Sequence, residues 1–133
     1  MRPSKQFRRT GDHSPGSQLC TRPRGRLSAG AHTQIKVRNS GTIELKTHIL
    51  NKNAETFVAG HIHQAPSGVA GPVVVPLFVA PAPATNARHI KQSGVATPNT
   101  GTTGADLCQN PSAYYVNYHT TAFPGGAIRG QLR

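Results

Sequence analysis

Hydrophobic and polar residues alternate with a period of two between Thr42 and Ile49. The apolar or β-branched residues at 43, 45, 47 and 49 share one side of an extended chain, while Glu44, Lys46 and His48 share the other. Such alternation is typical of a strand that packs one face on a core and exposes the other to water. We therefore predict a strand here.

Further short strands follow, separated by turns that contain Gly and Pro. They are expected at 56–63, 72–80, 113–120, 127–132 and, most weakly, 88–91. One or two helical turns are expected within 104–112, and Phe123–Gly126 has the composition of a hairpin turn. Gly and Pro make up 25 of 133 residues, which favours an all-β sandwich or barrel over long helices.

The N-terminal segment, residues 1–33, shows neither strand nor helix periodicity. Its mixture of Arg, Ser, Gly, Pro and His buries too little apolar surface to offset the entropy of ordering the chain. Most of the net charge lies near this end, with +8 over residues 1–38 and +3 over residues 39–133. We predict a disordered basic tail over 1–33, which contacts polyanions non-specifically, and one folded domain over 34–133.

The sequence gives no sign of a membrane span or of a secretory signal. The longest mostly apolar stretch, residues 71–84, is too short for a bilayer and contains four prolines. The N-terminus carries early positive charge, but the apolar segment of a signal peptide does not follow it.

Two cysteines, Cys20 and Cys108, allow at most one intramolecular disulfide. Because Cys20 lies in the predicted tail, pairing requires that tail to dock on the domain. We therefore expect two free thiols, with Cys108 serving as a small buried hydrophobic residue.

Three segments of the C-terminal part have the order and spacing of a known family. They are Ala59–His63 with Gly71–Leu77, Ala105–Leu107 with Asn110 and Pro111, and Tyr114–Thr120 with Phe123–Leu132. Together they resemble the CHRD (chordin-type) domain over about residues 40–133. The resemblance implies an extracellular or cell-surface protein with a small antiparallel, Greek-key or immunoglobulin-like β-sandwich, distantly similar to copper-zinc superoxide dismutases. It implies no enzymatic activity.

Three histidines in these segments form a candidate metal site. Residues two apart in a strand point the same way, so His61 and His63 share a face while Ile62 points opposite. His119 joins them if the two strands are neighbours. Three neutral imidazoles with an open fourth position suit copper or zinc. The dismutases likewise use a His-x-His strand and a later histidine as ligands.

Each of these residues also has a structural alternative. A histidine on a sandwich often only hydrogen-bonds a loop carbonyl, and the sequence lacks a His- and Asp-rich loop for an adjoining zinc site, so dismutase activity is not predicted. Asn117 either orients His119 or makes a cross-strand hydrogen bond. Arg129 binds an anion, pairs with a carboxylate such as Asp106, or caps a loop.

Three functions follow from these observations. No matched nucleophile, base and acid are recognisable, so we predict a protein that is not an enzyme. The leading hypothesis is an extracellular binding or adhesion module of the CHRD type, with a protein or polysaccharide ligand. The second is a mononuclear copper or zinc protein that uses His61, His63 and His119. The third is a structural subunit that self-associates through its edge strands.

Overall fold

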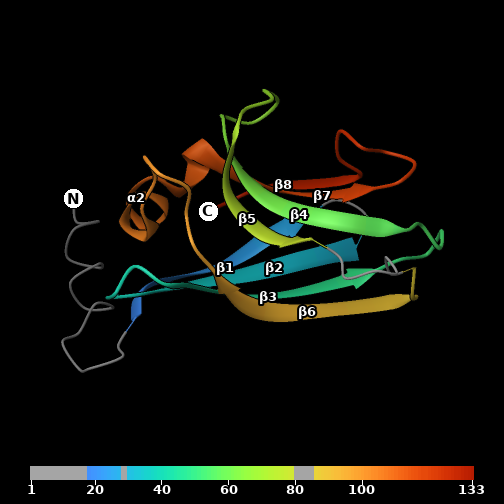
Figure 1. The fold of residues 1–133 in the computed structure, drawn as a ribbon, viewed down its shortest axis with the longest axis horizontal. Coiled ribbons are helices and arrows are strands. Elements are labelled where there is room, and N and C mark those ends of the chain that lie inside the picture. Colours follow the sequence, from blue (N-terminus) through green and yellow to red (C-terminus); the bar gives the residue numbers. More distant parts are fainter. Residues whose placement is uncertain (1–17, 28–29, 80–85) are drawn as a thin grey trace.

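A computed structural model describes residues 18–27, 30–79 and 86–133. Two antiparallel four-stranded sheets pack face to face, with a short helix at one end (Figure 1). The strands are β1 (Gln18–Leu27), β2 (Ala31–Arg38), β3 (Ile43–Leu50), β4 (Phe57–Gln64), β5 (Val73–Val79), β6 (His89–Ala96), β7 (Tyr114–Thr120) and β8 (Ile128–Gln131). Helix α2 (Gly104–Gln109) and the 3-10 turn η2 (Pro111–Ala113) connect β6 to β7. The predicted all-β sandwich is confirmed.

The two sheets have the strand orders β1-β2-β3-β6 and β5-β4-β7-β8. After β3 the chain crosses to the second sheet, forms the β4–β5 pair, and returns so that β6 pairs with β3. This return beside β3 is a Greek-key connection. Strand β6 runs to Ala96 and is therefore longer than the segment 88–91 expected from the sequence.

The ordered sheet begins earlier in the chain than the sequence predicted. Strand β1 and the first residues of β2 lie within the segment expected to be a tail, so the expected boundary at residue 34 falls inside β2. Strand β1 pairs with β2 through its backbone, with an irregular register between Arg22 and Gly25. Residues 1–17, 28 and 29 of the predicted tail lie outside the described residues.

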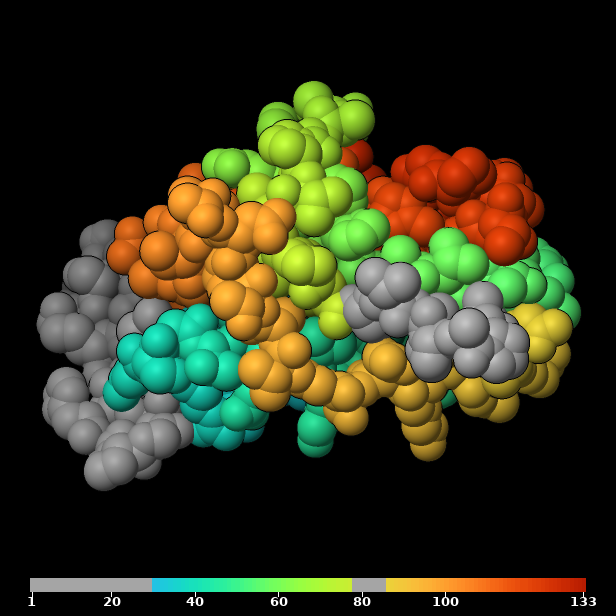
Figure 2. All heavy atoms as spheres, in the orientation of Figure 1, coloured from blue at the N-terminus to red at the C-terminus, as the bar shows by residue number. Residues whose placement is uncertain are grey.

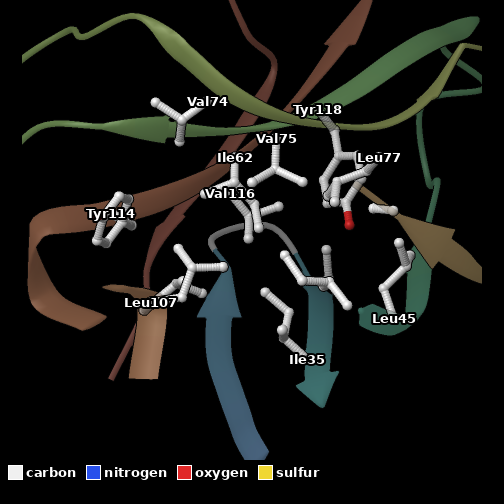
Figure 3. Packing of buried hydrophobic residues seen from close by; sticks show 14 of the residues in the cluster. Ile35, Leu45, Ile62, Val74, Val75, Leu77, Leu107, Tyr114, Val116 and Tyr118 are labelled. Carbon is white, nitrogen blue, oxygen red and sulfur yellow. The ribbon is translucent and has the colours of Figure 1, made fainter. Parts of the chain in front are cut away.

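The core lies between the inner faces of the two sheets. Ile35 and Leu45 from the first sheet meet Ile62 and Val116 from the second, and Leu107 of α2 closes one end (Figure 3). Burying such side chains contributes about 1.5–3 kcal/mol each, which makes this contact the main stabilisation of the sandwich.

A buried hydroxyl network joins the two sheets at the centre of this core. The Tyr118 Oη of β7 lies 2.7 Å from Thr33 Oγ1 of β2 and 2.5 Å from Thr47 Oγ1 of β3, and the two threonine hydroxyls lie 2.9 Å apart. All three side chains are almost completely inaccessible to solvent. Burial raises the pKa of Tyr118 to about 12, so the phenol remains a neutral hydrogen-bonding group.

Helix α2 begins with a capping box and carries the one cysteine whose side chain is described. Thr103 Oγ1 accepts the Asp106 N–H at 3.2 Å, and the Asp106 carboxylate accepts the Thr103 N–H at 2.8 Å. Cys108 is buried, as predicted, but it is disulfide-bonded, and Cys20 is the only other cysteine in the sequence. The expectation of two free thiols was wrong, because Cys20 belongs to strand β1 and α2 lies against that strand. No helix of the described residues is long and apolar enough to cross a membrane.

Candidate metal centre

Strands β4 and β7 are neighbours, and their pairing brings the three predicted histidines to one face. His119 is opposite Ala59, while His61 and His63 are opposite Asn117 and Tyr115. The alternate residues of these strands, among them Ile62 and Val116, point into the core. One ring nitrogen from each of His61, His63 and His119 lies within 4.8 Å of the others. The convergence expected from the sequence therefore exists on the outer face of this sheet.

His63 is held in a fixed orientation and is only 8% exposed. Its Nδ1 lies 2.9 Å from the Gly71 carbonyl oxygen, which can only accept, so Nδ1 carries the proton and Nε2 keeps its lone pair. The ring stacks on Tyr115, with centroids 4.9 Å apart and planes at 12°. His63 Nε2 is buried and has no hydrogen-bond partner among the described residues. An unsatisfied buried nitrogen is costly, and its position beside two other imidazoles requires an explanation.

His119 and His61 form a hydrogen-bonded pair beside His63. His119 Nδ1 donates to the Pro124 carbonyl at 2.9 Å, which leaves His119 Nε2 with its lone pair. His61 Nδ1 lies 2.9 Å from that Nε2 and donates to it in the neutral pair. The ring centroids of His61 and His119 are 4.8 Å apart, and those of His63 and His119 are 5.9 Å apart.

Two loops supply the carbonyl groups that orient these rings. In the loop after β4, Pro66 O accepts from Arg129 at 3.1 Å, and Gly71 N–H donates to Tyr115 Oη at 3.1 Å. Arg129 also covers the Tyr115 ring, its guanidinium carbon 3.4 Å from the ring centroid. Asn117 Nδ2 of β7 donates to the carbonyl oxygen of Gly125 in the β7–β8 loop at 3.2 Å.

These contacts decide between the alternatives left by the sequence. Arg129 caps a loop, which is one of the expected alternatives, and the Asp106 carboxylate caps α2 instead of pairing with Arg129. Asn117 holds the loop on which His119 is anchored rather than binding His119 itself. The roles of Gly71, Tyr115 and Pro124 were not anticipated, because strand alternation does not say which loop folds over a sheet face.

The surroundings of His61 and His63 favour their neutral forms. Burial is the main cause that lowers the pKa of His61, followed by the nearby His119 and His63. Burial also lowers the pKa of His63; the Gly71 hydrogen bond opposes this, and the charges of His119 and Arg129 add to it. Neutral imidazole is the form that binds metal ions.

The candidate ligand set consists of imidazoles alone. Of the three carboxylates in the described residues, Glu44 pairs with Arg38, Glu55 accepts from Thr120, and Asp106 caps α2. Three histidines without a carboxylate match the donors preferred by copper and zinc, and they leave a fourth position for water or another ligand.

Comparison with known proteins gives one family. A family model described as the CHRD domain matches residues 16–132 of the chain. No curated protein and no solved structure gives a match. The matched range includes both β1 and the three histidines.

Proposed function

The chain belongs to the CHRD domain family, and we propose that it is a non-enzymatic binding module that holds one copper or zinc ion. The ligands are His61, His63 and His119. The observation that carries the proposal is the buried, unpartnered Nε2 of His63, which lies beside the other two imidazoles.

The hydrogen bonds around the site support a metal more than a purely structural role. A structural histidine satisfies both ring nitrogens, whereas His63 satisfies one and buries the other. Backbone carbonyls fix the tautomers of His63 and His119 through Nδ1, which is the support usually found behind metal-binding imidazoles.

Titration of the full-length protein with copper(II) and with zinc(II), followed by calorimetry, tests the proposal. We expect one ion per chain, and loss of that binding when His61, His63 and His119 are all replaced by alanine. The double variant His48→Ala, His89→Ala is the matched control, because this exposed pair lies on the other sheet with ring centroids 5.6 Å apart. Stoichiometric binding that survives the triple substitution would contradict the proposal.

The pH dependence of binding gives a second, independent prediction. Protons compete with the metal for neutral imidazole, and the pKa values of His61 and His63 lie below their ordinary value of 6.5. We therefore expect proton competition at these two ligands to weaken copper binding only below about pH 6.5. Calorimetric dissociation constants across this range provide the measurement. A steep loss of affinity already between about pH 7.5 and 6.5 would contradict it.

We also propose that the protein functions outside the cytosol. The disulfide of Cys108 supports this location, because disulfides persist in oxidising compartments and are rare in the cytosol. Binding of a protein or polysaccharide ligand outside the cytosol is the adhesion function that the sequence suggests.

Self-association through edge strands receives less support from the geometry. Strand β5 is an edge strand, but Pro76 interrupts its row of N–H donors. The Val74 carbonyl accepts from the Asn99 N–H at 2.8 Å, and the Val73 carbonyl accepts from Asn99 Nδ2 at 3.3 Å. These contacts reduce the backbone groups that a second chain could pair with.

A further inference from the structure

The outer face of the sheet β1-β2-β3-β6 has a different chemistry from the metal centre. In β2, β3 and β6 the buried residues alternate with residues that point to solvent. The solvent-directed residues include six lysine and histidine side chains, which together we call the basic face: His32, Lys36, Lys46, His48, His89 and Lys91. Figure 2 shows long side chains of β3 and β6 projecting from the lower margin of the molecule.

The three lysines of the basic face lie on one diagonal across three strands. Lys36 of β2 pairs with Glu44 of β3. Lys46, which pairs with Gln34, lies two residues further along β3. Lys91 of β6 pairs with His48, which lies another two residues along β3. Each step therefore crosses one strand and advances two residues. Diagonal neighbours of this kind are about 7–8 Å apart, so the lysines form an evenly spaced row.

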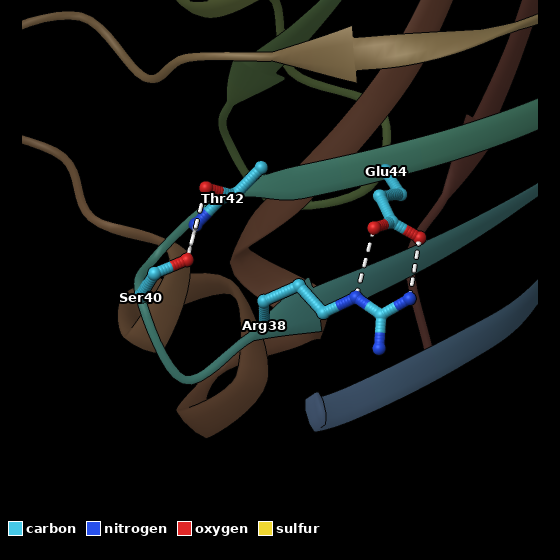
Figure 4. A network of polar contacts seen from close by, with 4 residues as sticks. All are labelled: Arg38, Ser40, Thr42 and Glu44. Atoms are coloured by element: carbon cyan, nitrogen blue, oxygen red, sulfur yellow. Dashed lines mark hydrogen bonds and ion pairs between the residues drawn. The ribbon is translucent and has the colours of Figure 1, made fainter. Parts of the chain in front are cut away.

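One carboxylate lies beside this row, and Lys36 and Lys46 are among the charges that act on it. Glu44 is the one carboxylate on the described part of this face, and Arg38 engages it through Nε at 2.8 Å and Nη2 at 3.1 Å (Figure 4). The hydrogen bond to Arg38 is the main cause that lowers the pKa of Glu44. Within the described residues, no ion pair involves Lys36, Lys46 or Lys91.

The row also follows two adjoining hollows in the surface. Gln34, Lys46 and Ser93 line both hollows, which extend towards Lys36 at one end and towards His48 and Lys91 at the other. Amide, hydroxyl and imidazole groups beside ammonium groups provide hydrogen-bond donors for sulfate or carboxylate oxygens.

We propose that the basic face binds a linear sulfated polysaccharide that lies along the lysine diagonal. Charge complementarity to a chain with regularly spaced anions supports this occupant. Nucleic acid fits less well. The described part of the face carries no Phe, Tyr or Trp on which bases could stack, and it has no helix or projecting ribbon to enter a groove.

Calorimetry of the full-length protein with a heparin oligosaccharide tests this inference. Because ammonium groups that neutralise a polyanion release its counterions, the triple variant Lys36→Gln, Lys46→Gln, Lys91→Gln is expected to bind at least about 10-fold more weakly, with a shallower dependence on salt. The control variant Lys52→Gln, Arg88→Gln, Arg133→Gln removes the same charge outside the basic face, and we expect it to change binding less than about 3-fold.

Two outcomes would overturn the inference. One is equal weakening in the two triple variants, which would mean that only net charge matters. The other is displacement of heparin by an oligonucleotide of equal charge at the same or a lower concentration, which would favour a nucleic acid. Variants of His61, His63 and His119 are expected to bind heparin normally, so this test is independent of the metal proposal.

Discussion

A Gly71→Ala variant is expected to bind copper or zinc about 10- to 100-fold more weakly than the wild type. A β-carbon at this position would collide with the carbonyl group of Gln64 and would lie 2.9 Å from Ala65 Cβ, so the loop must move. Gly71 supplies the carbonyl that holds His63 Nδ1 and the N–H bound by Tyr115 Oη. Displacing both contacts lets the His63 ring turn away from the other two imidazoles.

The matched control for this variant is Gly125→Ala. Gly125 lies in the loop that anchors His119, but a β-carbon there meets nothing within 4 Å. We expect this variant to bind metal as the wild type does. Calorimetric titration of both variants, with thermal unfolding to confirm that each is folded, provides the measurement. A folded Gly71→Ala protein with wild-type affinity would show that the carbonyl does not position His63.

Reduction of the Cys108 disulfide is expected to lower the free energy of unfolding by about 2–4 kcal/mol. Cys20 is the only other cysteine in the sequence, so the bond closes most of the chain into one loop and joins α2 to strand β1. In the unfolded chain such a bond restricts many conformations, and its loss restores their entropy.

Urea unfolding with and without a reductant measures this effect. The variant Cys20→Ser, Cys108→Ser should unfold at the same midpoint in both conditions and should resemble the reduced wild type. Equal midpoints for the oxidised and reduced wild type, together with titratable thiols in the untreated protein, would contradict the prediction.

The sequence allowed most strands to be predicted wherever burial follows strict alternation. Strand β3 is the clearest case, because Ile43, Leu45, Thr47 and Ile49 all point into the core. Strand β6 was predicted too short, since it lies at a sheet edge and buries only Ile90 and Ala96.

Strand β1 was missed for a different reason. Its central residues, Arg22 to Arg26, contain Pro23 and Gly25 and lack any apolar alternation. Backbone pairing with β2 and the disulfide are tertiary features that bring this segment into the sheet, and local sequence patterns do not report them.

The clustering of the three histidines was predictable from the sequence, but the loop contacts that hold their rings were not. Period-two geometry placed His61 and His63 together, and the CHRD resemblance singled out His119. Which strands are neighbours, and which loop carbonyls hold the rings, depend on contacts between distant parts of the chain. Gly71 and Pro124 therefore had no recognisable signal as positioning residues.

The hydroxyl network around Tyr118 has a consequence for the alignment of the two layers. Two sheets that meet only through aliphatic side chains can pack at several offsets with similar free energy. Here an offset of one residue pair would separate the Tyr118 phenol from Thr33 and Thr47 and leave polar groups in the core without partners. The network thus selects one offset between the two sheets and thereby fixes the position of strand β7 relative to the first sheet.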